Sequence, residues 1–147
     1  MIMGLSAFML AITGALSPAS AATYWWYSNT NGCLGSSGGN ALVLPCTSQT
    51  TQDWYWGTES NQWQGHTMRR LVNRYTGACL TTDNATELNA VWMSPCGGGR
   101  SGQFWTADNN HIQNQNGNFL ISDQDGTLNT VREGADAPVF LWYGHLV

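Results

Sequence analysis

The segment "CGGGRSGQFW" (residues 96–105) decides the fold, because an earlier part of the chain has the same order of features. The segment "CTSQTTQDW" (residues 46–54) also runs from a cysteine, through a polar stretch, to Gln-x-Trp. Glycine and small polar residues between such anchors form turns. Two segments of this kind indicate that one structural unit occurs more than once in the chain.

Three copies of the unit are found when the sequence is aligned on a glycine followed by an apolar pair. They begin at "TNGCLGSS" (30–37), "TGACLTTD" (76–83) and "NGNFLISD" (116–123). Each copy continues through a polar turn, an alternating strand and a second polar loop to a tryptophan, which is Trp54, Trp105 or Trp142. The glycines Gly32, Gly77 and Gly117 are 45 and 40 residues apart, a period typical of a reused supersecondary unit.

Each copy is expected to contain about four short strands, because apolar and polar residues alternate with period 2 between polar breaks. The sequence has no apolar stripe of helical period over three turns. A four-stranded unit cannot bury a face by itself, whereas closing three units around a common axis removes most exposed sheet edges. We therefore predict one all-β domain over residues 22–147, a pseudo-threefold barrel capped by hairpins, with repeats at about 24–72, 73–112 and 113–147.

The first 21 residues, "MIMGLSAFMLAITGALSPASA", are predicted to be a secretory signal peptide (1–21). They form an apolar run that ends in Ala-Ser-Ala, the small-residue pattern of a cleavage site, although the run has no basic residue at its start. A membrane anchor is the weaker alternative, because Gly4, Gly14 and Pro18 interrupt a run already short for a bilayer span. We expect a secreted, extracellular protein without membrane insertion.

Composition limits the possible partners. Charged residues make up 10% of the chain, lysine is absent, and the formal net charge is -4. Nucleic acids and anionic membranes are bound through clustered Lys and Arg, so neither is expected as a partner. Eight tryptophans and 17 glycines with few charges are typical of a loop-rich extracellular β protein. We expect the protein to be a monomer on its own.

The four cysteines are an even set in a chain expected to be exported, which favours disulfides. Three connectivities are possible, and we favour Cys33 with Cys46 and Cys79 with Cys96, because each pair then lies within one repeat. Each bridge would contribute about 3 kcal/mol by closing a loop of this length. A zinc site is the competing use, but the sequence has no Cys-x-x-Cys clip, so no metal or cofactor is expected.

These motifs resemble those of the ricin B-type β-trefoil lectins. The resemblance rests on the Gly-x-Cys-Leu start, the apolar-Pro-Cys strand end and Gln-x-Trp at residues 52–54 and 103–105. The third copy departs from the pattern, with Phe119 in place of cysteine and Phe-Leu-Trp at 140–142. The resemblance implies a β-trefoil fold, a core role for each tryptophan, and a glutamine that supports a neighbouring sugar site.

The resemblance also implies where sugar-binding residues would lie, and this chain lacks them there. The family's carboxylate usually lies two residues after the first cysteine of a repeat, where this sequence has Gly35, Thr81 and Ile121. The aromatic platform usually lies two residues before the second cysteine, where we assign Leu44, Ser94 and, in the third copy, Arg132. All three standard sites are therefore expected to be damaged.

A displaced sugar site is one hypothesis. Asp83 and Asp123 lie four residues after Cys79 and Phe119, so strand alternation keeps them on the face of the usual carboxylate. In the second repeat such a site would consist of Asp83, Asn84, Asn89 and Trp92. The alternative is that Asp83-Asn84 is a turn and Trp92 a half-buried sheet residue. In the third repeat "DQDGT" (123–127) is predicted to be a hairpin turn rather than a calcium loop.

The first repeat contains an insertion. Trp54 and Gly77 are 23 residues apart, whereas Trp105 and Gly117 are 12 apart, so about 11 residues are added around "ESNQWQGHTMRR" (59–70). An insertion into a repeat maps to a loop and often to a binding face. One interpretation is a partner-binding surface, and the other is a hairpin whose tryptophan packs over the barrel mouth. The candidate partner-binding residues are Trp63, His66, Arg69 and Arg70.

The sequence predicts no catalytic activity. It has no His-Glu-x-x-His, no Gly-x-Ser-x-Gly, and its "GGGRSG" lacks the lysine of a phosphate-binding loop. The leading hypothesis is a secreted, non-catalytic binding module for a glycan. The alternative is a protein-binding trefoil that acts as an adaptor, subunit or inhibitor of another secreted protein, for example in a toxin or hydrolase assembly.

Overall fold

The computed structural model describes residues 21–98 and 101–147, so the predicted signal peptide lies outside the described residues except for Ala21. Strands and turns make up this part of the chain, which contains no α-helix and only four short 3-10 turns. No helix in these two ranges is long and apolar enough to cross a bilayer. The all-β prediction is confirmed.

The strands fall into three groups of four. The first group is β1 (Trp25–Asn29), β2 (Gly32–Ser37), β3 (Asn40–Leu44) and β4 (Trp54–Trp63). The second is β5 (His66–Asn73), β6 (Cys79–Thr82), β7 (Leu88–Ser94) and β8 (Phe104–Thr106). The third is β9 (Gln113–Asn114), β10 (Phe119–Ser122), β11 (Leu128–Val131) and β12 (Tyr143–Leu146). Strand β5 begins in the predicted first repeat and ends in the second, because β4 and β5 form one continuous hairpin.

Three of the four 3-10 turns in the described residues lie at equivalent places in the repeats. Turns η1 (Thr50–Gln52), η2 (Ser101–Gln103) and η4 (Pro138–Phe140) each lie just before the strand or residue that carries the repeat's tryptophan. The remaining turn, η3 (Asp108–Asn110), precedes the short strand β9. The third repeat therefore keeps the turn of the Gln-x-Trp motif although proline, valine and phenylalanine supply it.

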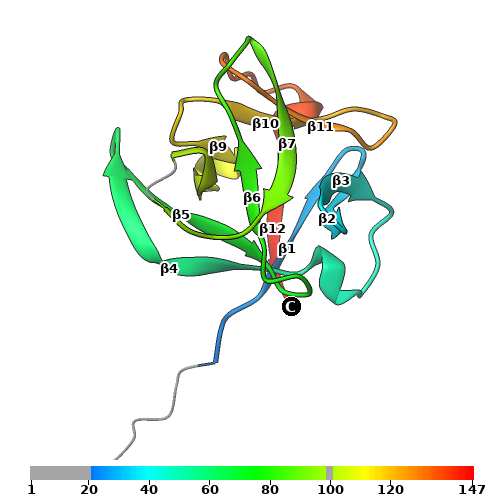
Figure 1. Cartoon of the computed structure of the whole chain (residues 1–147). Coiled ribbons are helices and arrows are strands. Elements are labelled where there is room, and N and C mark those ends of the chain that lie inside the picture. The colour runs from blue at the N-terminus through cyan, green and yellow to red at the C-terminus, as the bar shows by residue number, and fades with distance from the viewer. Residues whose placement is uncertain (1–20, 99–100) are drawn as a thin grey trace, which may run out of the picture.

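The twelve strands form a β-trefoil (Figure 1). Strands β1, β4, β5 and β8 pair in sequence, β8 pairs with β9, and β12 pairs with β1, which gives the barrel. The hairpins β2–β3, β6–β7 and β10–β11 form the cap, and they also pair with one another through β7. The last strand thus returns to the first, and the Val147 N–H donates to the Tyr24 carbonyl at 3.1 Å.

The core is built from the same tryptophan of each repeat. Trp54, Trp105 and Trp142 are at most 1% exposed. Each indole Nε1–H donates to a carbonyl of the hairpin in its own repeat, at 3.0, 2.9 and 3.0 Å. The acceptors are Leu34, Leu80 and Leu120, which are themselves fully buried. The core role that the resemblance implied for the tryptophan therefore holds in all three repeats.

The cysteines and glutamines of the repeated motif fasten the loop that leads to the tryptophan. Disulfides join Cys33 to Cys46 and Cys79 to Cys96, which confirms the favoured connectivity. In the first repeat Gln52 accepts from the Thr47 N–H at 2.8 Å and donates to the Pro45 carbonyl at 2.8 Å. Gln52 thus bonds to the residues on both sides of Cys46 and holds this polar loop in place. Both the donor and the acceptor of its buried amide have partners, as buried polar groups usually do.

Candidate functional site

The register of the hairpins fixes which residues occupy the family's sugar-binding positions. Cys79 lies opposite Ser94 in the second repeat, and Cys33 lies opposite Leu44 in the first. In the third repeat Phe119 lies opposite Val131. The predicted platform position at Arg132 is therefore wrong by one residue, because the third copy has no second cysteine from which to count.

Internal contacts occupy these positions. The Thr81 hydroxyl lies 2.6 Å from the Ser94 hydroxyl, and Gln103 Nε2 donates to both, at 3.4 and 2.9 Å. In the first repeat a Cβ added at Gly35 would lie 3.3 Å from the Gln52 side chain. In both disulfide-bonded repeats the glutamine of Gln-x-Trp thus covers the place where the family's carboxylate would lie.

The structure brings together three of the four residues of the proposed displaced site. Asp83 Oδ1 accepts from the Ala85 N–H at 3.3 Å, which is an Asx turn. Buried Asn89 accepts from the Thr86 N–H at 2.9 Å, and Asn84 accepts from Asn118 Nδ2 at 3.3 Å. These contacts shape the loop between β6 and β7. Half-buried Trp92 lies farther along β7, opposite Thr81.

Asp123 lies at the hairpin between β10 and β11. Its N–H donates to the Thr127 carbonyl at 2.9 Å, and Gly126 adopts φ +88°, so the predicted hairpin turn is confirmed. Asp125 accepts from the Thr127 N–H at 2.9 Å, and this hydrogen bond lowers the pKa of Asp125 below its ordinary value. Asp123 also lines a shallow polar hollow with Asn31 and Asp125.

The insertion is a hairpin extension of β4 and β5 that projects from the body of the domain (Figure 1). Gln64 and Gly65 make its turn with φ of 45° and 81°. Trp63 is half-buried, and a Cβ added at Gly117 would lie 3.9 Å from its ring. His66 Nδ1 lies 2.7 Å from Asp108 Oδ2. The hairpin is therefore anchored to the third repeat and to the loop after β8.

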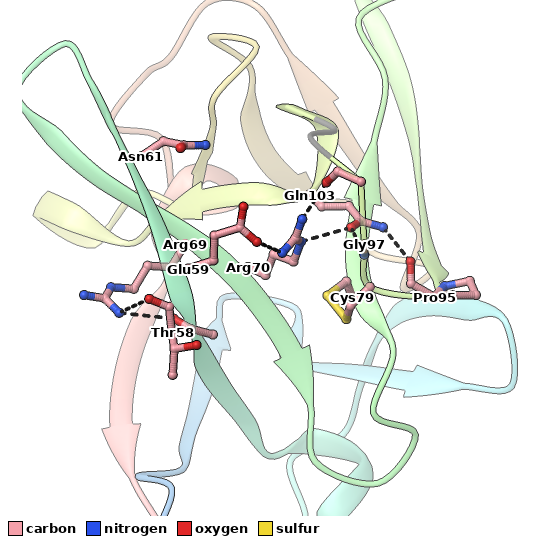
Figure 2. A network of polar contacts seen from close by, with 12 residues as sticks. Thr58, Glu59, Asn61, Arg69, Arg70, Cys79, Pro95, Gly97 and Gln103 are labelled. Atoms are coloured by element: carbon pink, nitrogen blue, oxygen red, sulfur yellow. Dashed lines mark hydrogen bonds and ion pairs between the residues drawn. A yellow bond between two sulfur atoms is a disulfide. The ribbon is translucent and has the colours of Figure 1, made fainter.

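Arg70 holds the hairpin to the second repeat (Figure 2). Its guanidinium donates to Glu59 at 2.5 Å, to the Gly98 carbonyl at 2.6 Å and to Gln103 at 3.3 Å. It also lies 4.6 Å from the ring centroid of Phe104, and the side chain is only 12% exposed. Arg70 therefore packs within the domain. The sequence analysis had named it as a candidate partner-binding residue.

Arg69 is on the opposite face of β5, because successive side chains of a strand alternate. Its guanidinium donates to the Gly57 carbonyl at 3.2 Å (Figure 2). The side chain lines a hollow of about 370 Å³, which we call the axial pocket. The axial pocket is lined by Trp25, Tyr27, Trp56, Thr67, Arg69, Trp105, Thr106, Ala107, Asp108, Asn110 and Gly144.

The walls of the axial pocket include one equivalent position from each of the three repeats. Trp56, Ala107 and Gly144 each follow the core tryptophan of their repeat by two residues. One large and two small side chains at these positions leave a hollow on the pseudo-threefold axis.

A second set of equivalent positions forms the rim of the axial pocket. In each repeat an asparagine, Asn29, Asn73 or Asn114, accepts through its side-chain Oδ1 from the backbone N–H two residues later. The rim residue lies four residues before this asparagine. The three rim residues are Trp25, Arg69 and Asn110. The same position of the repeat therefore supplies an indole, a guanidinium and an amide to a single rim.

Turn η3 supplies the polar side of the rim. Asn109 and Asn110 both adopt left-handed backbone conformations, with φ of 55° and 58°, which asparagine tolerates better than most residues. The Asn110 carbonyl accepts from the Trp142 N–H at 2.8 Å, which fixes the turn against the third repeat. Left-handed residues other than glycine are concentrated at functional sites.

The protonation states of two groups in the axial pocket follow from their contacts. The hydrogen bond from His66 holds the pKa of Asp108 below its ordinary value, so the carboxylate is ionised at neutral pH. Burial raises the pKa of Tyr27 to about 12, and its hydroxyl accepts from Trp56 Nε1 at 2.9 Å. The pocket thus presents indole surfaces, a neutral phenol, an amide, a guanidinium and a carboxylate. Over residues 21–98 and 101–147, no cluster of three His, Cys, Asp or Glu could hold a metal ion.

Sequence reasoning missed Trp56, Asp108 and Asn110, because Trp56 lies about 50 residues before the other two and the three form no local motif. Counting two residues onward from each core tryptophan could have found Trp56, since it aligns Trp56 with Ala107 and Gly144.

Known proteins share the fold of this chain without close sequence similarity. A scan of protein families and a search of curated protein sequences both find no match. Among solved structures, the chain is similar to the designed threefold protein ThreeFoil, with TM-score 0.61, 16% identity and coverage of 82% of this chain and 96% of that chain. It is similar to the C-half of the earthworm R-type lectin in complex with GalNAc, with TM-score 0.63, 13% identity and coverage of 85% and 99%.

A third similar structure is larger. The GlcNAcα1-4Gal-releasing endo-β-galactosidase from Clostridium perfringens matches with TM-score 0.65 and 15% identity, over 85% of this chain and 32% of the enzyme. The chain therefore spans about a third of that protein's length. At these identities the similarities establish the β-trefoil fold alone.

Proposed function

We propose that this protein is a secreted, non-catalytic module that binds carbohydrate, and that the axial pocket holds the sugar. The observation that carries the proposal is the combination of Trp25 and Trp56 with Asp108, Asn110 and Arg69 around one hollow. A pyranose has an apolar C–H face that stacks on an aromatic ring and a rim of hydroxyls that need donors and acceptors. The axial pocket offers both.

The size and charge of the axial pocket support a small, neutral ligand. Its volume of about 370 Å³ is at the lower end for ligand sites, which favours a single sugar ring. One arginine and one ionised aspartate line it, so their charges balance. Asp108 is the only acid among the lining residues, whereas glycoside hydrolysis ordinarily needs a pair of carboxyl groups, which supports a non-catalytic role.

The fold and the disulfides support the rest of the proposal. The earthworm protein with the same fold is an R-type lectin bound to GalNAc. Two disulfides are typical of proteins that mature in an oxidising compartment, in agreement with the predicted signal peptide. The alternative, a protein-binding trefoil, would use the hairpin insertion without Arg70, whose contacts lie inside the domain.

A glycan array followed by calorimetric titration tests the proposal. We expect Trp56→Ala and Asp108→Asn each to weaken sugar binding by about tenfold or more, because stacking and a charge-assisted hydrogen bond are each worth on the order of 1–3 kcal/mol. Asp136→Asn, the same change at a carboxyl group that is 94% exposed and does not line the axial pocket, is the matched control and should leave binding unchanged.

Three outcomes would overturn the proposal. Sugar binding that survives both pocket variants but is lost in Asp83→Ala and Trp92→Ala would place the sugar in the displaced site. Absence of binding to any glycan would reject the carbohydrate function. If a secreted partner is then captured and its binding is lost in Trp63→Ala, the protein-binding alternative is correct.

A further inference from the structure

The position after each rim residue carries a different side chain in each repeat. On β1 and β5 this position faces away from the axial pocket, because successive side chains of a strand alternate. Its three occupants are Trp26, Arg70 and His111. Arg70 pairs with Phe104, the residue just before the core tryptophan of its repeat, and the equivalent residues of the other repeats are Asp53 and Leu141.

In the second and third repeats this side chain binds a backbone carbonyl of the loop that follows the cap hairpin. Arg70 Nη2 donates to the Gly98 carbonyl at 2.6 Å, and His111 Nε2 lies 2.9 Å from the Ala135 carbonyl oxygen. Both carbonyls belong to the residue four places after the hairpin partner of the repeat's first cysteine position. The equivalent residue of the first repeat is Ser48.

The first repeat has a tryptophan at this position and a hollow beside the loop. Trp26 stacks on His145, with ring centroids 4.0 Å apart and an interplanar angle of 18°. The hollow has a volume of about 420 Å³, and we call it the Ser48 pocket. It is lined by Trp26, Cys46, Thr47, Ser48, Asp53, Leu146 and Val147.

Asp53 gives the Ser48 pocket a carboxylate that is nearly buried. Its side chain is 10% exposed, and its Oδ2 accepts from Arg74 Nη1 at 3.0 Å. Asp53 is the only charged side chain among the lining residues, and the whole chain carries a formal net charge of -4. Oδ1 of Asp53 and the Ser48 carbonyl are acceptors, so the pocket favours a cation that donates hydrogen bonds.

We propose that the Ser48 pocket binds an arginine side chain of a partner polypeptide. The second repeat shows what fits the equivalent place, because a guanidinium there donates to the Gly98 carbonyl and lies 4.6 Å from the ring centroid of Phe104. A guanidinium is planar, stacks on aromatic rings and donates to several acceptors at once. In the Ser48 pocket it would stack on the Trp26 indole and donate to Asp53 and Ser48.

The apolar edge of the Ser48 pocket favours a polypeptide as the source of the guanidinium. Leu146 and Val147 are 62% and 65% exposed there. Such surface accommodates the methylene stem of an arginine and the residues next to it. The Ser48 pocket and the axial pocket share no lining residue, so this inference is independent of the proposed carbohydrate function.

An NMR titration of the protein with capped peptides tests this inference. The probe is acetyl-Gly-Arg-Gly-amide, compared with the same peptide containing citrulline, which has nearly the shape of arginine without its charge. We expect the arginine peptide to bind at least about tenfold more tightly than the citrulline peptide. Trp26→Ala and Asp53→Asn should each weaken its binding by about tenfold. Trp92→Ala and Asp136→Asn, the same changes outside the Ser48 pocket, are the matched controls and should leave binding unchanged.

Trp26→Arg tests the inference without removing a contact that the fold needs. The introduced arginine should donate to the Ser48 carbonyl as Arg70 donates to the Gly98 carbonyl. The variant should therefore keep its unfolding midpoint and lose peptide binding, because its own guanidinium occupies the pocket.

Several results would reject the inference. These are absence of binding, equal affinity for the arginine and citrulline peptides, and binding that survives in Trp26→Arg. Tighter binding of free arginine than of the capped peptide would identify an amino acid as the ligand and would reject the polypeptide. Glycan binding that is lost in Trp26→Arg but kept in Trp56→Ala would make the Ser48 pocket the sugar site. Arginine binding without any glycan binding would reject the proposed function and leave this inference standing.

Discussion

Replacing the core tryptophan by phenylalanine should cost nearly the same stability in each repeat. Trp54, Trp105 and Trp142 are all at most 1% exposed, and each donates one hydrogen bond of 2.9–3.0 Å to a buried carbonyl. Phenylalanine cannot donate, and a buried acceptor without its partner costs about 1–3 kcal/mol. The smaller ring also loses buried area and leaves a void, which adds about 1–2 kcal/mol. We expect each substitution to lower the free energy of unfolding by about 2–5 kcal/mol.

Guanidinium unfolding with both disulfides intact measures this cost. The control is Trp63→Phe at the half-buried hairpin tip, where we expect a change below about 1 kcal/mol. The informative comparison is Trp142, because its repeat lacks both the cysteines and the Gln-x-Trp glutamine. If Trp142→Phe costs less than half of what the other two substitutions cost, the three repeats do not contribute equivalent core residues and the symmetry argument is refuted.

Two further predictions concern protonation. The pKa of Tyr27 is about 12 in the folded chain against 10.0 ordinarily, so from pH 10 to 12 the unfolded state ionises first. The free energy of unfolding should therefore fall by up to about 3 kcal/mol over that range, and urea titrations should show that Tyr27→Phe removes this loss; an identical loss in the variant would contradict the assignment. The hydrogen bond from His66 lowers the pKa of Asp108, so His66→Ala should raise that pKa. As the solution is acidified, the variant should therefore lose sugar binding at a higher pH than the unmodified protein does. Carboxylate titration by NMR measures the shift, and an unchanged Asp108 titration would show that His66 does not set its charge.

Much of the fold could be predicted because the repeated unit has strong local signals. Each cysteine pair lies within one repeat, which indicated the disulfide connectivity, and the resemblance to the ricin B-type lectins implied the core role of the tryptophan at the end of each copy. The third repeat was recognised without its cysteines because Gly117, Leu120 and Trp142 remain at their places. Its register was harder to predict, and the assignment of Arg132 in place of Val131 shows the cost of losing a cysteine as a marker.

The candidate site could be predicted only in part, because it depends on which face of a strand each residue occupies. Arg69 and Arg70 were treated as one surface, but alternation along β5 directs Arg70 toward Phe104 and Arg69 into the axial pocket. The axial pocket itself joins Trp25 to Asn110 across most of the chain. Composition and spacing say which residues are present, whereas a hollow arises from the sizes of side chains at three symmetry-related positions.

The pairing of β12 with β1 leaves both ends of the domain at one edge of the barrel. A chain joined between Val147 and the segment before β1, and opened in the Gln64–Gly65 turn, would retain every strand pair of the barrel and the cap. Such a circular permutant would begin with β5 and end with β4, so the third unit would occupy the middle of the sequence. The same closeness of the ends would let the whole domain be inserted into a surface loop of a host protein through two adjacent connections.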